Sequence, residues 1–211
     1  MTEGAFISEA RGLMASLEGE PAHATHVARL AVTLFDATQD QHQLTASHRL
    51  ILEMAACLHD IGWSAAPSGK GHHKASARLI LDYPWKCGEP RAVSLVAQIA
   101  RYHRKSIPNP GHAEFAALNV EDRRIVEVLA GLLRIADGLD RGHLQRVTHL
   151  RVLARANAFV IEISGLGPLD VELQGASRKA ELAQIVFCKP FEFQQSPGPA
   201  HLPCLSPLWG E

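Results

Sequence analysis

The sequence predicts a mainly α-helical protein, a helical bundle over residues 1–145 followed by a small α+β appendage over 146–193. Apolar residues recur at helical spacing in successive segments as far as about residue 143, and two β-branched runs begin near residue 146. The last segment, 194–211, is rich in proline and is expected to be irregular or disordered. With 211 residues, 46% of them hydrophobic, the chain can bury a sizeable core.

The first strong helical pattern follows Glu20-Pro21, where apolar residues at 24, 27, 28, 30, 31, 34 and 35 form one stripe. The proline suits the first turn of a helix. The next helix is expected from Thr45, as its N-cap, to Leu58, with Gly62 as the stop signal that lets the backbone turn away.

Three further helices are expected in the bundle: about His72 to Leu81, from Glu89-Pro90 to near Arg104, and Asn119 to about Asp137. The segment PNPG at 108–111 separates the last two. In the appendage, 146–166 reads as a hairpin that turns at 155–157, 170–187 as a helix, and 191–193 as a short strand. No catalytic cluster stands out in the appendage, which is expected to serve packing or dimerisation.

Composition argues against several classes of function. The net charge of −1 does not suggest a DNA, RNA or anionic-membrane partner, and no run approaches 18 uninterrupted apolar residues. The N-terminal segment lacks a signal-peptide pattern. The four cysteines lie far apart, which argues against a zinc ribbon or disulfide framework and suits the reducing cytoplasm.

Four polar side chains fall on the apolar stripes of four expected helices: His23, His59, His103 and Asp137. His59, for example, follows apolar residues at i−4 and i−7, which places it on the buried face. Any one such residue is more often a hydrogen-bonded core residue than a ligand. Four that converge from different helices, with Asp60 next to His59, instead indicate a metal site of nitrogen and oxygen ligands.

Basic side chains gather near these presumed ligands and suit a phosphorylated substrate. They are Lys70, His73 and Lys74 in GKGHHK, and Arg104 and Lys105 in RYHRK. Solvated charges at helix ends are the alternative interpretation, since cations favour helix C-termini anyway.

The arrangement of His23, His59-Asp60, His72, His103 and Asp137 resembles the HD superfamily of metal-dependent phosphohydrolases. His73 competes with His72 for its place in that pattern. A closer resemblance covers 5–193, through EPAHATHVARLAVTLFD, LILEMAACLHDIGW, GHHKASARLIL, IARYHRKSIP and LAGLLRIADGLDRGH. These segments are similar to the C-terminal half of the exopolyphosphatase / guanosine pentaphosphate phosphohydrolase family. That half is an HD-like helical domain followed by a small α+β domain, and the family's chain-cleaving chemistry belongs to actin-like domains that this sequence does not resemble.

Two hypotheses follow from the resemblance. The first is an HD-type phosphohydrolase acting on a nucleotide, an alarmone or another phosphate ester with one or two divalent ions (Mn, Fe, Zn, Ni, Co or Mg). His23, His59, Asp60 and Asp137 would hold metal, His72 and His103 would complete a second site, and Asp60 could bridge two ions. Asp60 and Lys70 are the expected catalytic residues. The expected phosphate-binding residues are Lys70, His73, Lys74, Arg104, Lys105 and Arg141.

The second hypothesis is a non-catalytic module that binds polyphosphate or a nucleotide, and that could form a homodimer. The presence of all six presumed ligands favours the enzyme. His26 could join the site, Asp140 and Arg141 are expected to cap a helix end and pair locally, and the remaining histidines are interpreted as ordinary: His42, His48, His112, His143, His149 and His201.

Overall fold

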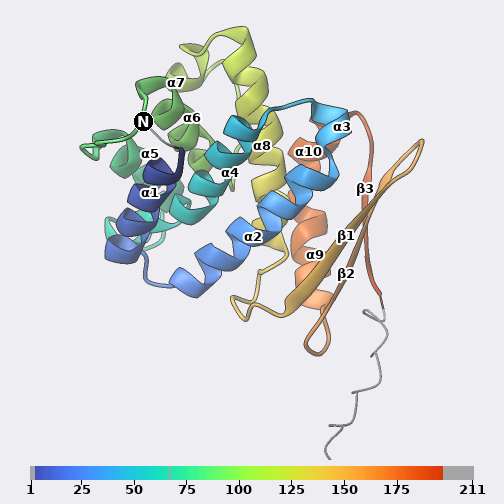
Figure 1. The fold of residues 1–211 in the computed structure, drawn as a ribbon. Coiled ribbons are helices and arrows are strands. Elements are labelled where there is room, and N and C mark those ends of the chain that lie inside the picture. Colours follow the sequence, from blue (N-terminus) through green and yellow to red (C-terminus); the bar gives the residue numbers. More distant parts are fainter. Residues whose placement is uncertain (1–2, 67, 197–211) are drawn as a thin grey trace, which may run out of the picture.

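The computed structural model describes residues 3–66 and 68–196 (Figure 1). It confirms a mainly α-helical fold with a small α+β part. The α-helices are α1 (Glu3–Leu17), α2 (Pro21–Ala37), α3 (Gln39–His42), α4 (Ala46–Leu58), α5 (His72–Asp82), α6 (Pro90–Arg101), α7 (Ala113–Ala116), α8 (Val120–Gly138), α9 (Asp170–Lys179) and α10 (Glu181–Phe187). A 3-10 helix, η1 (Ile61–Ser64), follows α4. The strands are β1 (Val147–Ala154), β2 (Phe159–Gly165) and β3 (Phe191–Gln195).

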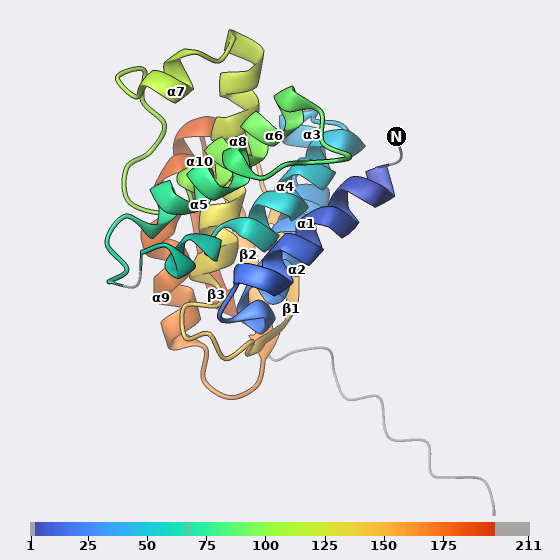
Figure 2. The ribbon, with the colours of Figure 1, turned by 90° about the vertical axis from the view of Figure 1, so that its left-hand side faces the viewer.

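Helix α8 is the centre of the molecule. It runs between α2, α4 and α6 on one side and α9 and α10 on the other (Figures 1 and 2). Every residue from Val128 to Gly138 is buried, as expected for a helix that is covered all round. One hydrophobic cluster extends from Phe6 in α1 to Phe191 in β3, so the helical part and the appendage share a core.

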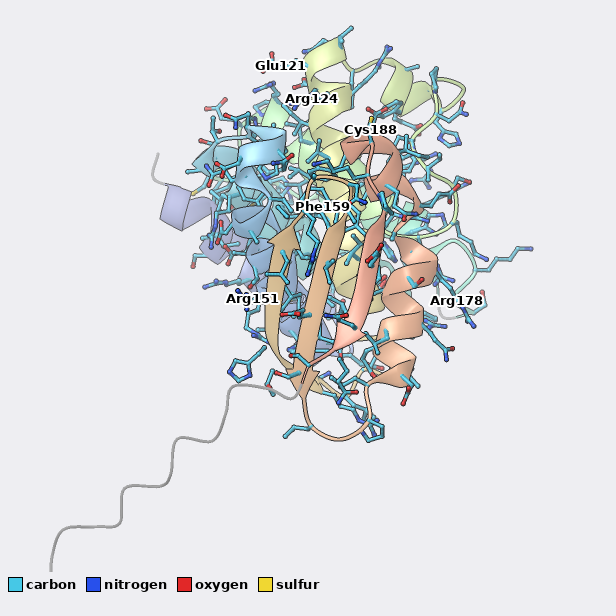
Figure 3. All side chains as sticks on the ribbon, turned by 90° about the vertical axis from the view of Figure 1, so that its right-hand side faces the viewer. Glu121, Arg124, Arg151, Phe159, Arg178 and Cys188 are labelled. Carbon is cyan, nitrogen blue, oxygen red and sulfur yellow. The ribbon has the colours of Figure 1, made fainter. Side chains whose placement is uncertain are left out.

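The appendage forms a three-stranded sheet in the order β1-β2-β3. The expected hairpin is confirmed, because β1 and β2 pair antiparallel around the turn at 155–157. The expected short strand is also present as β3, which pairs parallel to β2. Figure 3 shows the three strands side by side with α9 next to β3. Of the expected irregular tail, Gln194 and Gln195 belong to β3, and 197–211 lie outside the described residues.

Several helix boundaries differ from the expectation. The helix after Pro90 ends at Arg101, not near Arg104, and the imidazole of His103 accounts for this, since its Nδ1–H donates to the carbonyl of Ala100 at 2.7 Å. The single helix expected over 170–187 is two helices that break at Ala180, and Val171 and Ile185 are exposed. The short helices α3 and α7 were not foreseen. Helices α4 and α8 begin where expected, with Thr45 and Asn119 as their N-cap residues.

Gly62 has a different role from the expected one. It lies inside η1 rather than at a left-handed turn that ends α4. A Cβ on Gly62 would overlap the backbone of His72 and Ser76 in α5, and would lie 2.7 Å from the Ser76 hydroxyl. That hydroxyl donates to the carbonyl of His59 at 2.6 Å and accepts from the N–H of Gly62 at 2.9 Å. Gly62 therefore lets α5 pack directly on the turn that carries His59 and Asp60.

We expect Gly62→Ala to destabilise the protein by about 2–3 kcal/mol, because the added methyl group forces α5 away from this turn. Thermal and urea denaturation measure the change. Gly12→Ala is the matched control, because Gly12 lies within α1 with no atom near its Cβ position. The control should stabilise the protein by about 0.5–1 kcal/mol. Equal stability of the two variants would contradict the close packing of α5 on η1.

Candidate metal centre

The structure brings six buried polar side chains together where helices end. His23 lies in the first turn of α2, His59 and Asp60 follow α4, His72 begins α5, His103 follows α6 and Asp137 lies in the last turn of α8. They form two groups in which the possible ligand atoms lie within 4.8 Å of one another: His23–His59–Asp137 and Asp60–His72–His103. We call these the first triad and the second triad. The sequence analysis had grouped Asp60 with His23, His59 and Asp137.

All four imidazoles are anchored through Nδ1. The Nδ1–H of His59 donates to the carbonyl of Ala56 at 2.7 Å, and that of His103 bonds Ala100 in the same way. The Nδ1–H of His72 donates to the carbonyl of Gly69 at 3.1 Å. His23 Nδ1 lies 2.8 Å from Oδ2 of Asp140. A hydrogen bond at Nδ1 leaves the Nε2 lone pair free for a metal, and this arrangement is typical of histidine ligands.

The atoms that face inward in the first triad lack partners. Nε2 of His23 and Nε2 of His59 are buried and make no hydrogen bond. Nε2 of His23 lies 3.7 Å from Oδ1 of Asp137, and Oδ2 of Asp137 forms an ion pair with the ammonium group of Lys179. Buried polar atoms without partners are costly, so these two nitrogens indicate a site for a ligand.

Asp60, a member of the second triad, also approaches the first triad. Its Oδ1 is 3.1 Å from Nε2 of His72 and 3.4 Å from Nε2 of His103, and its Oδ2 is 3.6 Å from Nε2 of His59. Asp60 could therefore contribute one oxygen to each triad. The guanidinium group of Arg104 also approaches the second triad, with Nη1 3.1 Å from Nε2 of His72.

The charges in the centre shift the pKa values of its members. Burial opposes ionisation of Asp60, but the positive field of His59 and the hydrogen bond with His72 outweigh it and hold the pKa of Asp60 well below its usual range. The pKa of Asp137 is also lowered, because Lys179 and His59 outweigh burial. Burial lowers the pKa of His59, but the negative charges of Asp60 and Asp137 raise it by more than burial lowers it. The pKa of His59 therefore lies above its ordinary value. Burial keeps the pKa of His103 well below its ordinary value, with the positive field of His59 adding to it.

Asp140 and His143 belong to this centre, although the sequence suggested only a helix-capping and local pairing role for Asp140 and no role for His143. Asp140 is fully buried and accepts from the backbone N–H of Gln145 at 2.8 Å as well as contacting His23. It therefore orients a presumed ligand in addition to making the expected local contact. His143 stacks on His23 with ring centroids 3.7 Å apart. One feature of the sequence could have placed Asp140 in the centre: it follows Asp137 by three residues, and this spacing puts both carboxylates on one side of the helix end.

A cavity of about 440 Å³ opens from the second triad and Asp137 toward the surface. Its lining includes three of the expected phosphate-binding residues, Arg104, Lys105 and Arg141. Arg178 and Lys179 of α9 complete the basic lining, and Figure 3 shows Arg178 extending from α9 at the edge of the molecule. The appendage, which is expected to serve packing or dimerisation, therefore also supplies cations to the cavity.

The other expected phosphate-binding residues do not line this cavity. Lys70 is exposed in the loop before α5, and Lys74 is exposed on α5 and faces a different groove. Burial lowers the pKa of His73, and the positive charges of His72 and Arg104 lower it as well, to about 4. His73 is therefore neutral at neutral pH. The geometry gives no support to Lys70 as a catalytic residue or to His73 as a phosphate-binding cation. His72 points into the centre, so residues 73 and 74 are rotated away from it by the helix.

His26 does not belong to either triad, and its Nδ1 lies 3.4 Å from the guanidinium group of Arg29.

No described helix combines the length and apolarity that a membrane span needs. Three cysteines lie within the described residues, Cys57, Cys87 and Cys188, and all three are free thiols.

Comparison with protein families finds a match to the family described as Ppx/GppA phosphatase, domain III, over residues 8–166. The match covers most of the chain, including every member of both triads, and confirms the resemblance to the exopolyphosphatase-related family. A search of curated proteins finds no match. The segment that carries Arg178 and Lys179 lies beyond the matched range.

We expect His103 to stay neutral from pH 8 down to about pH 6, because burial lowers its pKa well below the ordinary value. Its proton should reside on Nδ1, since Nδ1 faces the carbonyl of Ala100. Long-range ¹H–¹⁵N correlation NMR reports both the charge and the tautomer, and His103→Gln assigns the signals by their loss. A proton on Nε2, or protonation of His103 above pH 6, would contradict the geometry of the second triad.

Proposed function

The chain belongs to the family of Ppx/GppA phosphatase domain III, and from that premise we propose that it is an HD-type, metal-dependent phosphohydrolase. The proposed substrate is a nucleotide, an alarmone or another small phosphate ester. The observation that carries the proposal is the pair of triads, in which four imidazoles anchored at Nδ1 converge with two carboxylates, and from which Asp60, His72, His103 and Asp137 line a basic cavity.

The donor set fits one or two divalent ions. Neutral imidazole nitrogens and carboxylate oxygens suit Zn, Mn, Fe, Co and Ni, and the unpartnered Nε2 atoms of His23 and His59 give such an ion ligands that are already desolvated. In a two-ion centre, His23, His59 and Asp137 would hold one ion, and Asp60, His72 and His103 the other. A bound ion would supply Lewis acidity toward a phosphoryl oxygen and toward an attacking water.

The cavity supplies the remaining requirements for a phosphate ester. Its volume of about 440 Å³ is in the range of small-molecule sites. Arg104, Lys105, Arg141 and Arg178 place guanidinium and ammonium groups in its wall, where they would bind phosphate oxygens and stabilise the charge that develops during hydrolysis. The carboxylate of Asp60, held ionised by the imidazoles around it, would position the reacting groups between the two triads.

The second candidate is a binding module that holds polyphosphate or a nucleotide without hydrolysing it. One observation favours it: cations of the chain itself reach both triads, since Lys179 pairs with Asp137 and Arg104 lies against His72. We further propose that the protein works in the cytoplasm, where the three free thiols would stay reduced, and that it could act as a homodimer. The near-neutral net charge gives no reason to propose a nucleic-acid partner.

The proposal is tested by elemental analysis of the purified protein for Mn, Fe, Zn, Ni, Co and Mg, followed by a phosphatase and phosphodiesterase screen with the metal that is found. We expect a divalent metal near stoichiometry and release of phosphate or nucleotide from at least one substrate. Tight binding of nucleotide or polyphosphate without turnover would establish the second candidate. Absence of both metal and turnover would refute the enzyme.

Asp60→Asn should lower metal affinity at least about a hundredfold and abolish turnover, because it replaces the one charged oxygen donor of the second triad. Isothermal titration calorimetry measures the affinity, and circular dichroism checks that the fold is intact. The matched control is Asp82→Asn, which alters an exposed carboxylate at the end of α5. Unchanged metal affinity in a folded Asp60→Asn protein would count against the centre.

Asp140→Asn should weaken metal binding by about 10–100-fold without removing any ligand, because the amide no longer gives His23 a charged partner at Nδ1. The same titration and the same Asp82→Asn control apply. If metal affinity were the same as in the unaltered protein, the orientation of His23 by Asp140 would have no bearing on the centre.

A further inference from the structure

We propose that the ammonium group of Lys179 takes the place of a metal cation in the first triad. The protein then binds one divalent ion, at the second triad, whereas without this lysine the two triads would bind two. This inference rests on the proposed function in one respect, namely that the centre binds metal. It goes further by assigning unequal roles to the two triads and by giving the appendage a place in the centre.

The contact between Lys179 and Asp137 carries the proposal. Lys179 is the last residue of α9, and its ammonium group forms an ion pair with Oδ2 of Asp137. The side chain of Lys179 is 19% exposed and that of Asp137 is 9% exposed, so water screens the pair poorly. The lysine therefore neutralises the only carboxylate of the first triad.

In the second triad the carboxylate has no such partner among the residues that the structure describes, because the cation that approaches this triad, Arg104, contacts the imidazole of His72 at 3.1 Å instead. Within the described residues, the ion-pair contacts of Asp60 are all to imidazoles, those of His59, His72 and His103. Its charge remains available to a divalent ion. The two triads offer the same kinds of donor atom, two imidazoles and one carboxylate, and they differ in whether a lysine is already paired with the carboxylate.

The packing of α9 on α8 fixes Lys179 in this position. A Cβ on Gly138 would lie 2.6 Å from the Cα of Ala176, so the two helix backbones touch at Gly138 and Gly175. Lys179 follows Gly175 by four residues, which places it one turn further along the same face of α9. Gly138 directly follows Asp137. The close approach of the two glycines thus directs the ammonium group to the carboxylate.

A divalent ion in the first triad would have to share Asp137 with this ammonium group or displace it. The lysine carries the same sign of charge as the ion, and the low exposure of the site makes the repulsion between them strong. The second binding step should therefore be weak in the unaltered protein, and it should strengthen when the charge of Lys179 is removed.

The test uses the full chain and Mn²⁺ alone. We expect the unaltered protein to bind one Mn²⁺ per chain and to show the electron paramagnetic resonance spectrum of a single ion. Lys179→Met should bind a second Mn²⁺ at least about tenfold more tightly than the unaltered protein does, and show the spectrum of two coupled ions. Arg178→Met, which removes an adjacent charge that does not contact Asp137, should still bind one ion.

Gly175→Ala gives an independent approach, because it displaces α9 and Lys179 together while leaving the lysine charge in place. It too should admit the second ion, which keeps the proposal testable if Lys179→Met does not fold. Two ions bound with equal affinity to the unaltered protein and to Lys179→Met would overturn the inference and leave the proposed function standing. No Mn²⁺ bound to any of the folded proteins would overturn both.

Discussion

The centre depends on the hydrogen bond that each of four histidines makes through Nδ1. Three of these bonds run to a carbonyl three residues earlier in the chain, and the fourth runs to Asp140. Each bond fixes the orientation of a ring and aims Nε2 at the same small volume, which also receives Asp60 and Asp137. Buried imidazoles and carboxylates are costly in a protein core unless something compensates for them. A metal centre is the compensation that this geometry favours, and the ion pair between Lys179 and Asp137 provides part of it within the chain itself.

Close backbone contacts hold this arrangement in place. Gly62 allows α5 to pack on the turn after α4, which sets the second triad against the first. Gly138 and Gly175 allow α9 to pack on α8, which brings the appendage to the cavity. The helical part and the appendage thus share more than a hydrophobic core, since the basic wall of the cavity contains residues of both. Specificity for a phosphorylated ligand would then depend on α9 as much as on the helices that carry the triads.

The sequence predicted the local features well and the long-range ones poorly. The apolar residues four and seven positions before His59, His103 and Asp137 were enough to place these side chains on buried faces. The position of Lys179 could not be predicted in the same way, because it depends on a contact with Asp137, 42 residues away in the chain. Lys70 shows the limit of proximity in sequence: it lies close to His72 along the chain, but its side chain is exposed and does not line the cavity. Gly62 was recognised as important for the wrong reason, since spacing alone does not reveal which helix will pack against it.

If the two triads form a site for a divalent ion, crystals of the protein grown with Mn²⁺ should contain the ion there. Anomalous scattering locates the ion without any assumption about activity. We expect an anomalous peak within bonding distance of Asp60 and of Nε2 of His72 and His103, with the imidazoles still anchored through Nδ1. A protein that binds Mn²⁺ only at exposed carboxylates, with no peak at either triad, would contradict it.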